Sequence, residues 1–260
     1  MMIKFSKLLI RLCVVLLLNL SACGSDGSAV GVNSSELDST PQVLADYELL
    51  FIGNSHSSVN GLPDLVAILI EATGQGKTVN AALAPGSNFL AERLKDGTTQ
   101  ATLEARKWTH VFLQAQKYSS TGNFSYPTDA AEEWIRRIRK LPASPVMFPE
   151  WPRRGNTEEG QRVYELHVSI STREPACVAP VGLVWDAFIF RYPAIALHAA
   201  DGNHSNLNGA LLTAYIFYQI LTEKPANTLG YIAEIDVNEE TQRKLKEVAL
   251  DFHNQHLPCS

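Results

Sequence analysis

Residues 48–57 decide the fold and read Glu48-Leu49-Leu50-Phe51-Ile52-Gly53-Asn54-Ser55-His56-Ser57. The apolar run at the start predicts a short strand that ends at Gly53-Asn54. A serine then stands in a tight turn between this strand and a following helix, where its hydroxyl can face a substrate beside backbone N–H groups. The next helix is expected to begin at Pro63 and to end at Gly74.

Short apolar runs and helical patterns alternate along the rest of the chain. Further strands are expected over residues 78–83, 110–113, 145–148 and 178–181, and further helices over 88–95, 128–139, 207–221 and 236–252. Alternation at this spacing is typical of βαβ units with right-handed crossovers. The sequence therefore predicts an α/β fold, a three-layer α/β/α domain around a mostly parallel, about five-stranded, flavodoxin-like sheet.

The composition agrees with a globular domain. The chain has 260 residues, of which 45% are apolar, so it is long enough to bury a sizeable core. These figures exclude collagen, low-complexity disorder and a disulfide-stapled miniprotein. The 27 acidic residues outnumber the 22 basic ones, which argues against a nucleic-acid partner.

The N-terminal residues have the pattern of an export signal. Basic residues precede a short apolar run, and small residues follow it, as in a secretory signal peptide. The run is shorter than the roughly 20 residues of a transmembrane helix. Leu20-Ser21-Ala22-Cys23 resembles the bacterial lipobox, which implies lipid attachment at Cys23. An ordinary cleaved signal or an uncleaved anchor is the alternative.

This interpretation divides the chain into a signal peptide over 1–22, a flexible tether over 23–45 and a domain over 46–260. Gly24 after the cysteine resembles outer-membrane sorting, so we expect a lipoprotein anchored there and facing the periplasm or the cell surface. Two cysteines, Cys177 and Cys259, remain in the domain. In an oxidising compartment they either pair or stay as separate thiols.

Three polar loops adjoin the expected strands and helices. They are Gly53–Ser57, Pro85-Gly86-Ser87-Asn88 and Asp201-Gly202-Asn203-His204. In parallel α/β sheets, reactive groups collect where strands end and helices begin. A serine nucleophile needs a base, and that base needs an acidic partner. An Asp and a His three residues apart can both point towards one serine from a single loop. Taken alone, the serine and the aspartate are as typical of helix caps, and a lone histidine is more often structural.

Together these blocks resemble the SGNH/GDSL hydrolase superfamily, with the first block in a Gly-Asn-Ser-His variant. The resemblance spans roughly residues 47–221. It implies a serine esterase in which Ser55 attacks an ester carbonyl, His204 accepts the proton, and Asp201 orients His204. It also implies an oxyanion hole that includes the backbone N–H groups of Ser55 and Gly86.

The third block departs from the superfamily pattern, since no asparagine follows the strand over 110–113. The chain continues with Gln114-Ala115-Gln116, which resembles a branch in which glutamine replaces that asparagine. A glutamine amide donates the same kind of N–H. Gln116 or Gln114 would then complete the oxyanion hole; the alternative is that both glutamines only end a strand.

Further polar and aromatic residues are candidates for contacting substrate. These are Asn54, His56, Asn88 and Trp151. With Arg153 and Arg154, Trp151 would form a surface that binds sugar or carboxylate groups of the substrate. The alternative is that Trp151 is a half-buried residue of an ordinary loop. No histidine spacing matches a zinc pattern, so we expect no metal and no cofactor.

The expected activity is hydrolysis of short acyl esters, acetyl esters in particular, on a small molecule or a polysaccharide. Two alternatives use the same fold. One is a glycan-binding lipoprotein that has lost activity, which the altered third block favours. The other is an O-acyltransferase in which a sugar hydroxyl replaces water.

Overall fold

A computed structural model describes residues 44–253. The predicted signal peptide, Cys23, nearly all of the predicted tether, and Cys259 lie outside these residues. Cys177 takes part in a disulfide, but its pairing with Cys259 stays a prediction. Within residues 44–253, no helix combines the length and the apolar character that crossing a membrane requires.

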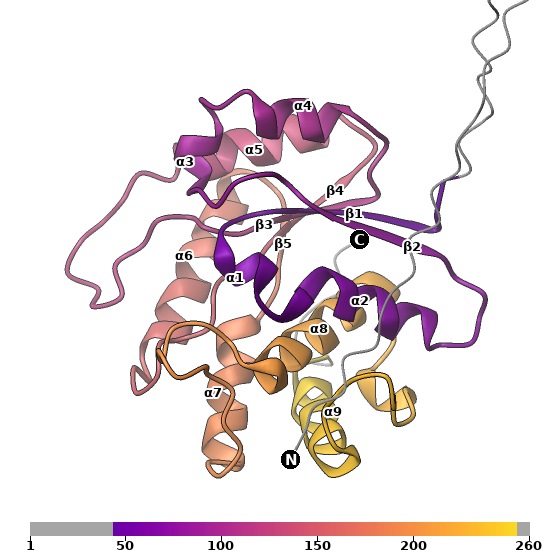
Figure 1. The fold of residues 1–260 in the computed structure, drawn as a ribbon. Coiled ribbons are helices and arrows are strands. Elements are labelled where there is room, and N and C mark those ends of the chain that lie inside the picture. Colours follow the sequence, from indigo (N-terminus) through magenta and orange to yellow (C-terminus); the bar gives the residue numbers. More distant parts are fainter. Residues whose placement is uncertain (1–43, 254–260) are drawn as a thin grey trace, which may run out of the picture. The chain divides into compact units, whose positions relative to one another are not determined.

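A single parallel sheet lies at the centre of the described domain (Figure 1). Its strand order is β2-β1-β3-β4-β5, and the strands are β1 (Tyr47–Ile52), β2 (Val79–Leu83), β3 (His110–Leu113), β4 (Ser144–Met147) and β5 (Cys177–Val178). Strand β1 pairs with β2 on one side and with β3 on the other, and Leu49 aligns with both Ala81 and His110. This is the flavodoxin-like order, which confirms the predicted fold class.

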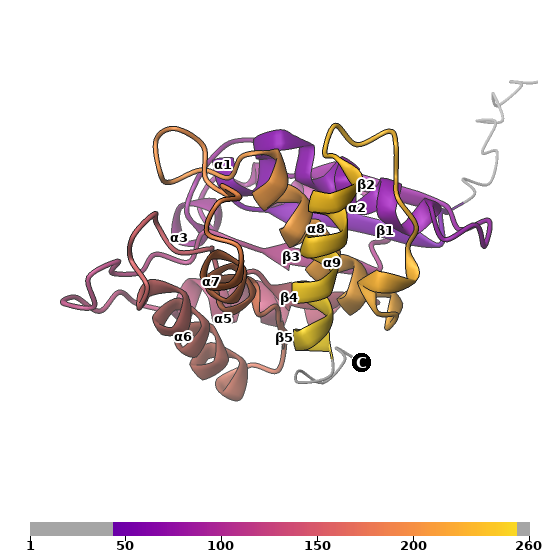
Figure 2. The same ribbon diagram turned by 90° about the horizontal axis from the view of Figure 1, so that it is seen from below.

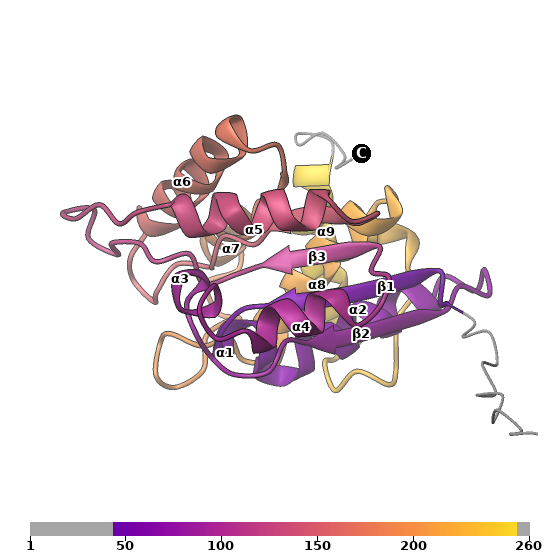
Figure 3. The same cartoon turned by 90° about the horizontal axis from the view of Figure 1, so that it is seen from above.

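Helices cover both faces of the sheet. On one face lie α2 (Leu62–Glu71), α7 (Val181–Arg191), α8 (Leu207–Thr222) and α9 (Glu239–His253) (Figure 2). On the other lie α3 (Leu90–Arg93), α4 (Thr98–Glu104) and α5 (Asp129–Arg139), with α6 (Glu159–Arg173) at the side (Figure 3). Alternate residues of β1 enter the two cores, Phe51 one and Ile52 the other. Burial on both faces explains why the strand is a continuous apolar run.

The structure differs from the sequence prediction after β4. The strand expected over 178–181 is only Cys177–Val178, and helix α7 begins at Val181. Helices α6 and α7 were not expected, and neither was α4 before β3. The buried face of α6 includes Glu159 and His167, so its apolar periodicity is weak. Helix α7 is rich in Val, Ile and Phe, which have no strong helix preference, and its burial against the core decides its conformation.

Candidate active site

Ser55 is the first residue of the short helix α1 (Ser55–Ser58), directly after β1. Asn54 caps this helix, because its Oδ1 accepts a hydrogen bond of 3.0 Å from the backbone N–H of His56. Gly53 has no room for a side chain, since an added Cβ would overlap Ser57 Oγ and Gln114 Oε1. The turn therefore holds Ser55 at the carboxyl edge of the sheet.

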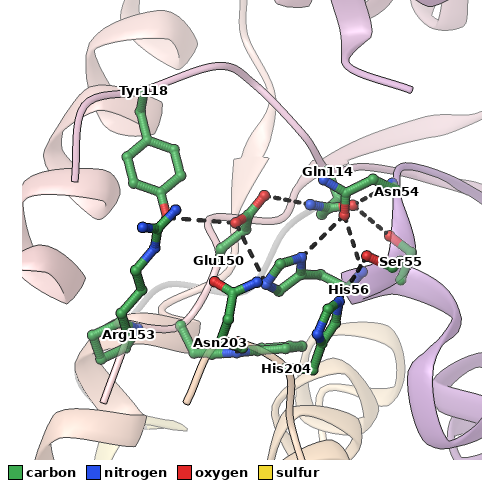
Figure 4. Close-up of polar contacts among 12 residues, drawn as sticks. Asn54, Ser55, His56, Gln114, Tyr118, Glu150, Arg153, Asn203 and His204 are labelled. Atoms are coloured by element: carbon green, nitrogen blue, oxygen red, sulfur yellow. Dashed lines mark hydrogen bonds and ion pairs between the residues drawn. The ribbon is translucent and has the colours of Figure 1, made fainter. Parts of the chain in front are cut away.

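Ser55, His204 and Asp201 form a chain of two hydrogen bonds, of which Figure 4 shows the one between Ser55 and His204. Ser55 Oγ lies 2.9 Å from His204 Nε2, and His204 Nδ1 lies 2.6 Å from Asp201 Oδ2. The hydrogen bond to His204, helped by bonds from backbone N–H groups, holds the pKa of the Asp201 carboxyl far below its usual range. Because an ionised carboxylate only accepts, the proton belongs on Nδ1, and Nε2 is left to accept the proton of the serine.

The loop that carries Asp201 and His204 is fixed from within. Asp201 Oδ1 accepts from the backbone N–H groups of Asn203 and His204, at 2.9 and 3.0 Å. Trp151 Nε1 donates to Asn203 O at 2.8 Å, and the Trp151 side chain is 2% exposed. We therefore correct the expectation that Trp151 contacts substrate: it is too deeply buried and supports the loop instead.

His56 also lies inside the site rather than at its surface, with 6% exposure. Its ring stacks on His204 at 5.0 Å between centroids and lies 5.0 Å from Trp151. Its Nδ1 is 3.1 Å from Asn54 Oδ1, and its Nε2 is 3.8 Å from Glu150 Oε2. His56 thus packs against the imidazole of His204, and its hydrogen bond to Asn54 fixes the position of the His56 ring.

The two glutamines of the third block form hydrogen bonds with residues other than Ser55. Gln114 Nε2 donates to Glu150 Oε1 at 2.5 Å, while its Oε1 accepts from Asn54 N at 2.7 Å and from Ser57 Oγ at 3.0 Å. Gln116 Nε2 donates to the backbone carbonyls of Lys117 and Pro127. Both N–H groups of the Gln116 amide are thus engaged, which argues against its expected role in the oxyanion hole. One N–H of the Gln114 amide is taken by Glu150, and the expected role of Gln114 stays a prediction. Gln114 also ties the nucleophile turn to Glu150.

Arg93, which sequence analysis passed over, holds the second loop. It is 1% exposed, and its guanidinium donates to the carbonyls of Gly53, Pro85 and Gly86 and to Thr99 Oγ1. The Pro85 carbonyl, at 2.9 Å, belongs to the same peptide group as the Gly86 N–H, so Arg93 sets the direction of that N–H. Gly86 has a φ of +84°, which favours glycine.

Asn88, in the same loop as Gly86, is also held by Arg93, because its backbone carbonyl accepts a hydrogen bond of 3.3 Å from Arg93 Nε. The local sequence does not predict that Arg93 is buried, because a single arginine in a short helix is usually exposed at the surface.

Behind the site lies a buried group of acidic side chains. Tyr118 OH donates to Glu159 Oε1 at 3.1 Å and, more weakly, to Glu150 Oε2 at 3.4 Å. Burial and these two carboxylates raise the pKa of the Tyr118 phenol, so it stays protonated. Burial, together with the charge of Glu159, also raises the pKa of Asp186 from 3.8 to about 7.

Replacing Asp186 is expected to change how stability depends on pH. The unfolded chain releases the proton of Asp186 near pH 4, but the folded protein holds it to about pH 7, so wild-type stability falls as pH rises between these values. Asp186→Asn, which keeps the neutral form, should therefore gain stability over wild type at pH 8 relative to pH 5. Thermal unfolding of both proteins at the two pH values measures this. The exposed Asp236→Asn serves as control, and a pH dependence like that of wild type in Asp186→Asn would contradict the expectation.

Ser55 and His204 open into a cavity of about 300 Å³ (Figure 4). The other lining residues are mostly polar: Asn54, His56, Phe89, Lys117, Tyr118, Ser120, Glu150, Arg153 and Asn203. A second cavity of about 520 Å³ shares Arg153 and Asn203 with the first. Over residues 44–253, no group of three or more His, Cys, Asp or Glu side chains has the arrangement of a metal site.

No known family profile matches this chain, and no curated protein is similar to it. Several solved structures are similar. A DUF4886 family protein from Bacteroides uniformis has a TM-score of 0.61 at 16% identity, covering 79% of this chain and 94% of its own. A candidate SGNH hydrolase from Slackia heliotrinireducens has a TM-score of 0.54 at 23% identity, covering 67% of this chain and 98% of its own.

A lipase/acylhydrolase from Enterococcus faecalis has a TM-score of 0.50 at 15% identity and covers 68% of this chain and 96% of its own. At these identities the likeness concerns the fold, and the strand order and helical layers agree with it. The chain therefore has the three-layer α/β/α fold of the SGNH hydrolases.

Proposed function

We propose that this protein is a serine hydrolase that cleaves carboxylic esters. The observation that carries the proposal is the hydrogen-bonded chain from Ser55 through His204 to Asp201, with bonds of 2.9 and 2.6 Å, at the wall of a cavity. This is the order of nucleophile, base and orienting carboxylate that acyl transfer requires.

In the proposed reaction, Ser55 Oγ bonds to the ester carbonyl carbon while His204 Nε2 takes the serine proton. Asp201 stabilises the imidazolium that forms. The tetrahedral intermediate then expels the alcohol, which takes the proton from His204, and an acyl-serine remains. Water, activated by His204, attacks this acyl-serine and releases the acid.

The oxyanion of that intermediate needs donors aimed at it. We assign this role to the backbone N–H groups of Ser55 and Gly86, the second held in direction by Arg93. One such donor is typically worth a factor of about 10² to 10³ in rate. A hole without the glutamine amides would thus give a slower enzyme rather than an inactive one.

The cavity favours a small acyl group and a polar alcohol. Its volume of about 300 Å³ and its mainly polar lining offer little apolar surface to a long acyl chain. We therefore propose acetyl esters of carbohydrates as the substrate class. We also propose export as a lipoprotein anchored through Cys23 in the outer membrane, which rests on the N-terminal sequence and which labelling with a radioactive fatty acid would test.

The proposal predicts covalent labelling of Ser55 by a fluorophosphonate, because such reagents phosphonylate an activated serine. Mass spectrometry should place the adduct on the peptide that contains Ser55, and Ser55→Ala should stay unlabelled. The matched control is Ser58→Ala, an exposed serine on the same helix, which should be labelled as wild type is. A folded wild-type protein that takes no label and cleaves no acetyl ester would instead favour a glycan-binding role.

A further inference from the structure

Two cations, Lys117 and Arg153, border the cavity into which Ser55 opens. Both residues are exposed, and within residues 44–253 neither forms an ion pair with a carboxylate. Two positive charges thus line the same cavity as Ser55 and His204, and no carboxylate of the described residues is paired to either.

Aromatic rings hold the ammonium group of Lys117. Its Nζ lies 5.3 Å from the ring centroids of both Phe89 and Tyr126. Phe89 itself lines the cavity, so the two contacts keep the charge near the cavity wall. Cation–π contacts leave the N–H groups of lysine available to bind an anion.

Arg153 lies where the two cavities meet. Its backbone N–H donates to the buried Glu159 at 2.7 Å, which fixes the position of its backbone. Its guanidinium lies close to Tyr118 at the side of the cavity away from Ser55 (Figure 4). The neighbouring Arg154 differs, because its guanidinium donates to the backbone carbonyls of His198 and Ala199 and so serves the loop.

Glu150, the acidic residue that lines this cavity, forms no ion pair with Lys117 or Arg153. Glu150 is buried, accepts hydrogen bonds from Gln114 and Tyr118, and lies 3.8 Å from His56. Its carboxylate is therefore engaged with Gln114 and Tyr118 rather than with Lys117 or Arg153. The exposed side of the cavity carries the positive charge.

We propose that Lys117 and Arg153 form a subsite for an anionic group, a carboxylate or a phosphate, on the alcohol portion of the ester substrate. The proposal rests on the proposed function, since it places the acyl group at Ser55 and the remainder of the substrate along the cavity. Asn203 and the second cavity would accommodate the part of the substrate beyond the anion. The substrate class is thereby narrowed from acetylated carbohydrates to acetylated acidic carbohydrates.

Three matched substrates test this: acetylated methyl glucoside, the corresponding glucuronoside, and the corresponding 6-phosphate. They differ only in the group at C6, which is a neutral CH2OH, a carboxylate or a phosphate ester. For wild type, kcat/KM for at least one anionic substrate should exceed that for the neutral one by about tenfold, as a charge-assisted hydrogen bond allows. Which anion is preferred identifies the source of the charge, and either preference supports the subsite.

The variants Lys117→Gln and Arg153→Gln should each lower this ratio, and Arg153→Glu should invert it. Lys140→Gln, which removes an exposed charge outside both cavities, should leave the ratio and all three rates as in wild type. Raising the salt concentration should lower the ratio as well, because these charges are exposed to solvent.

Equal kcat/KM for all three substrates, or a ratio that survives in the double variant Lys117→Gln/Arg153→Gln, would overturn the subsite. Those results leave hydrolysis at Ser55 intact. Failure of the proposed function has a different signature, namely no hydrolysis of any of the three esters and no labelling at Ser55.

Discussion

Ser55→Ala is expected to lower kcat for an acetyl ester by about 10⁴- to 10⁶-fold, the range that loss of a serine nucleophile costs in enzymes with a serine–histidine–carboxylate arrangement. The change deletes the Oγ atom that lies 2.9 Å from His204 Nε2, so no acyl-enzyme can form. The residual rate would come from the oxyanion donors and substrate binding. Initial-rate kinetics measure the loss.

Folding should survive this change. Ser55 is half-buried, and its hydroxyl has only His204 as a hydrogen-bond partner over residues 44–253. A thermal unfolding curve like that of wild type is therefore the control. If Ser55→Ala kept kcat within about tenfold of wild type, the nucleophile would have to be another group, because truncation of the true nucleophile is never so mild.

Asp201→Asn should lower kcat less, by roughly 10²- to 10³-fold. The Asp201 side chain is 50% exposed, so solvent water can partly stabilise the imidazolium of His204 when the carboxylate is removed. Combining Asp201→Asn with Ser55→Ala should cost no more than Ser55→Ala alone, since the two residues act on one step. An additive loss in the double variant would contradict a shared mechanism.

The fold was predictable because the pattern that encodes it is local. Each of the first three parallel strands is a short run that ends at a turn, and the buried helix α8 is apolar nearly all round. Helices α6 and α7 were not predictable in the same way. Glu159 and His167 lie on the buried face of α6, and only contacts with distant residues make room for them.

The residues of the site likewise divide into those that the sequence could predict and those that it could not. Ser55, Asp201 and His204 stand in recognisable short blocks, because the chemistry requires those residue types next to a turn. The residues that support them depend on contacts between distant segments: Gln114 bonds to Asn54 across 60 positions, and Arg93 to Gly53 across 40. A sequence without the fold gives no sign of such partners, which is why the bonds of Gln114 to Asn54 and Glu150 were not expected.

Arg93→Met is expected to have the second large effect, on stability and activity together. Arg93 is fully enclosed, and no carboxylate within residues 44–253 forms an ion pair with it; carbonyl groups and one hydroxyl take its hydrogen bonds. Methionine fills much of the same volume but leaves these buried carbonyls without donors. Such a loss costs about 3–5 kcal/mol of unfolding free energy. Denaturant unfolding measures it, with the exposed Arg139→Met as control.

The effect on activity separates positioning from mere stability. Arg93 joins the nucleophile turn to the loop of Gly86, so its removal should misalign the Gly86 N–H and lower kcat by about 10²-fold. KM should change little, because an oxyanion donor acts mainly in the transition state. Arg93→Lys keeps the charge but has a single ammonium group in place of the branched guanidinium, so it cannot reach all of these carbonyls. Its kcat and stability should therefore lie between those of wild type and Arg93→Met. Full kcat in a folded Arg93→Met protein would mean that the second loop keeps its geometry unaided, and Gly86 would then need no clamp.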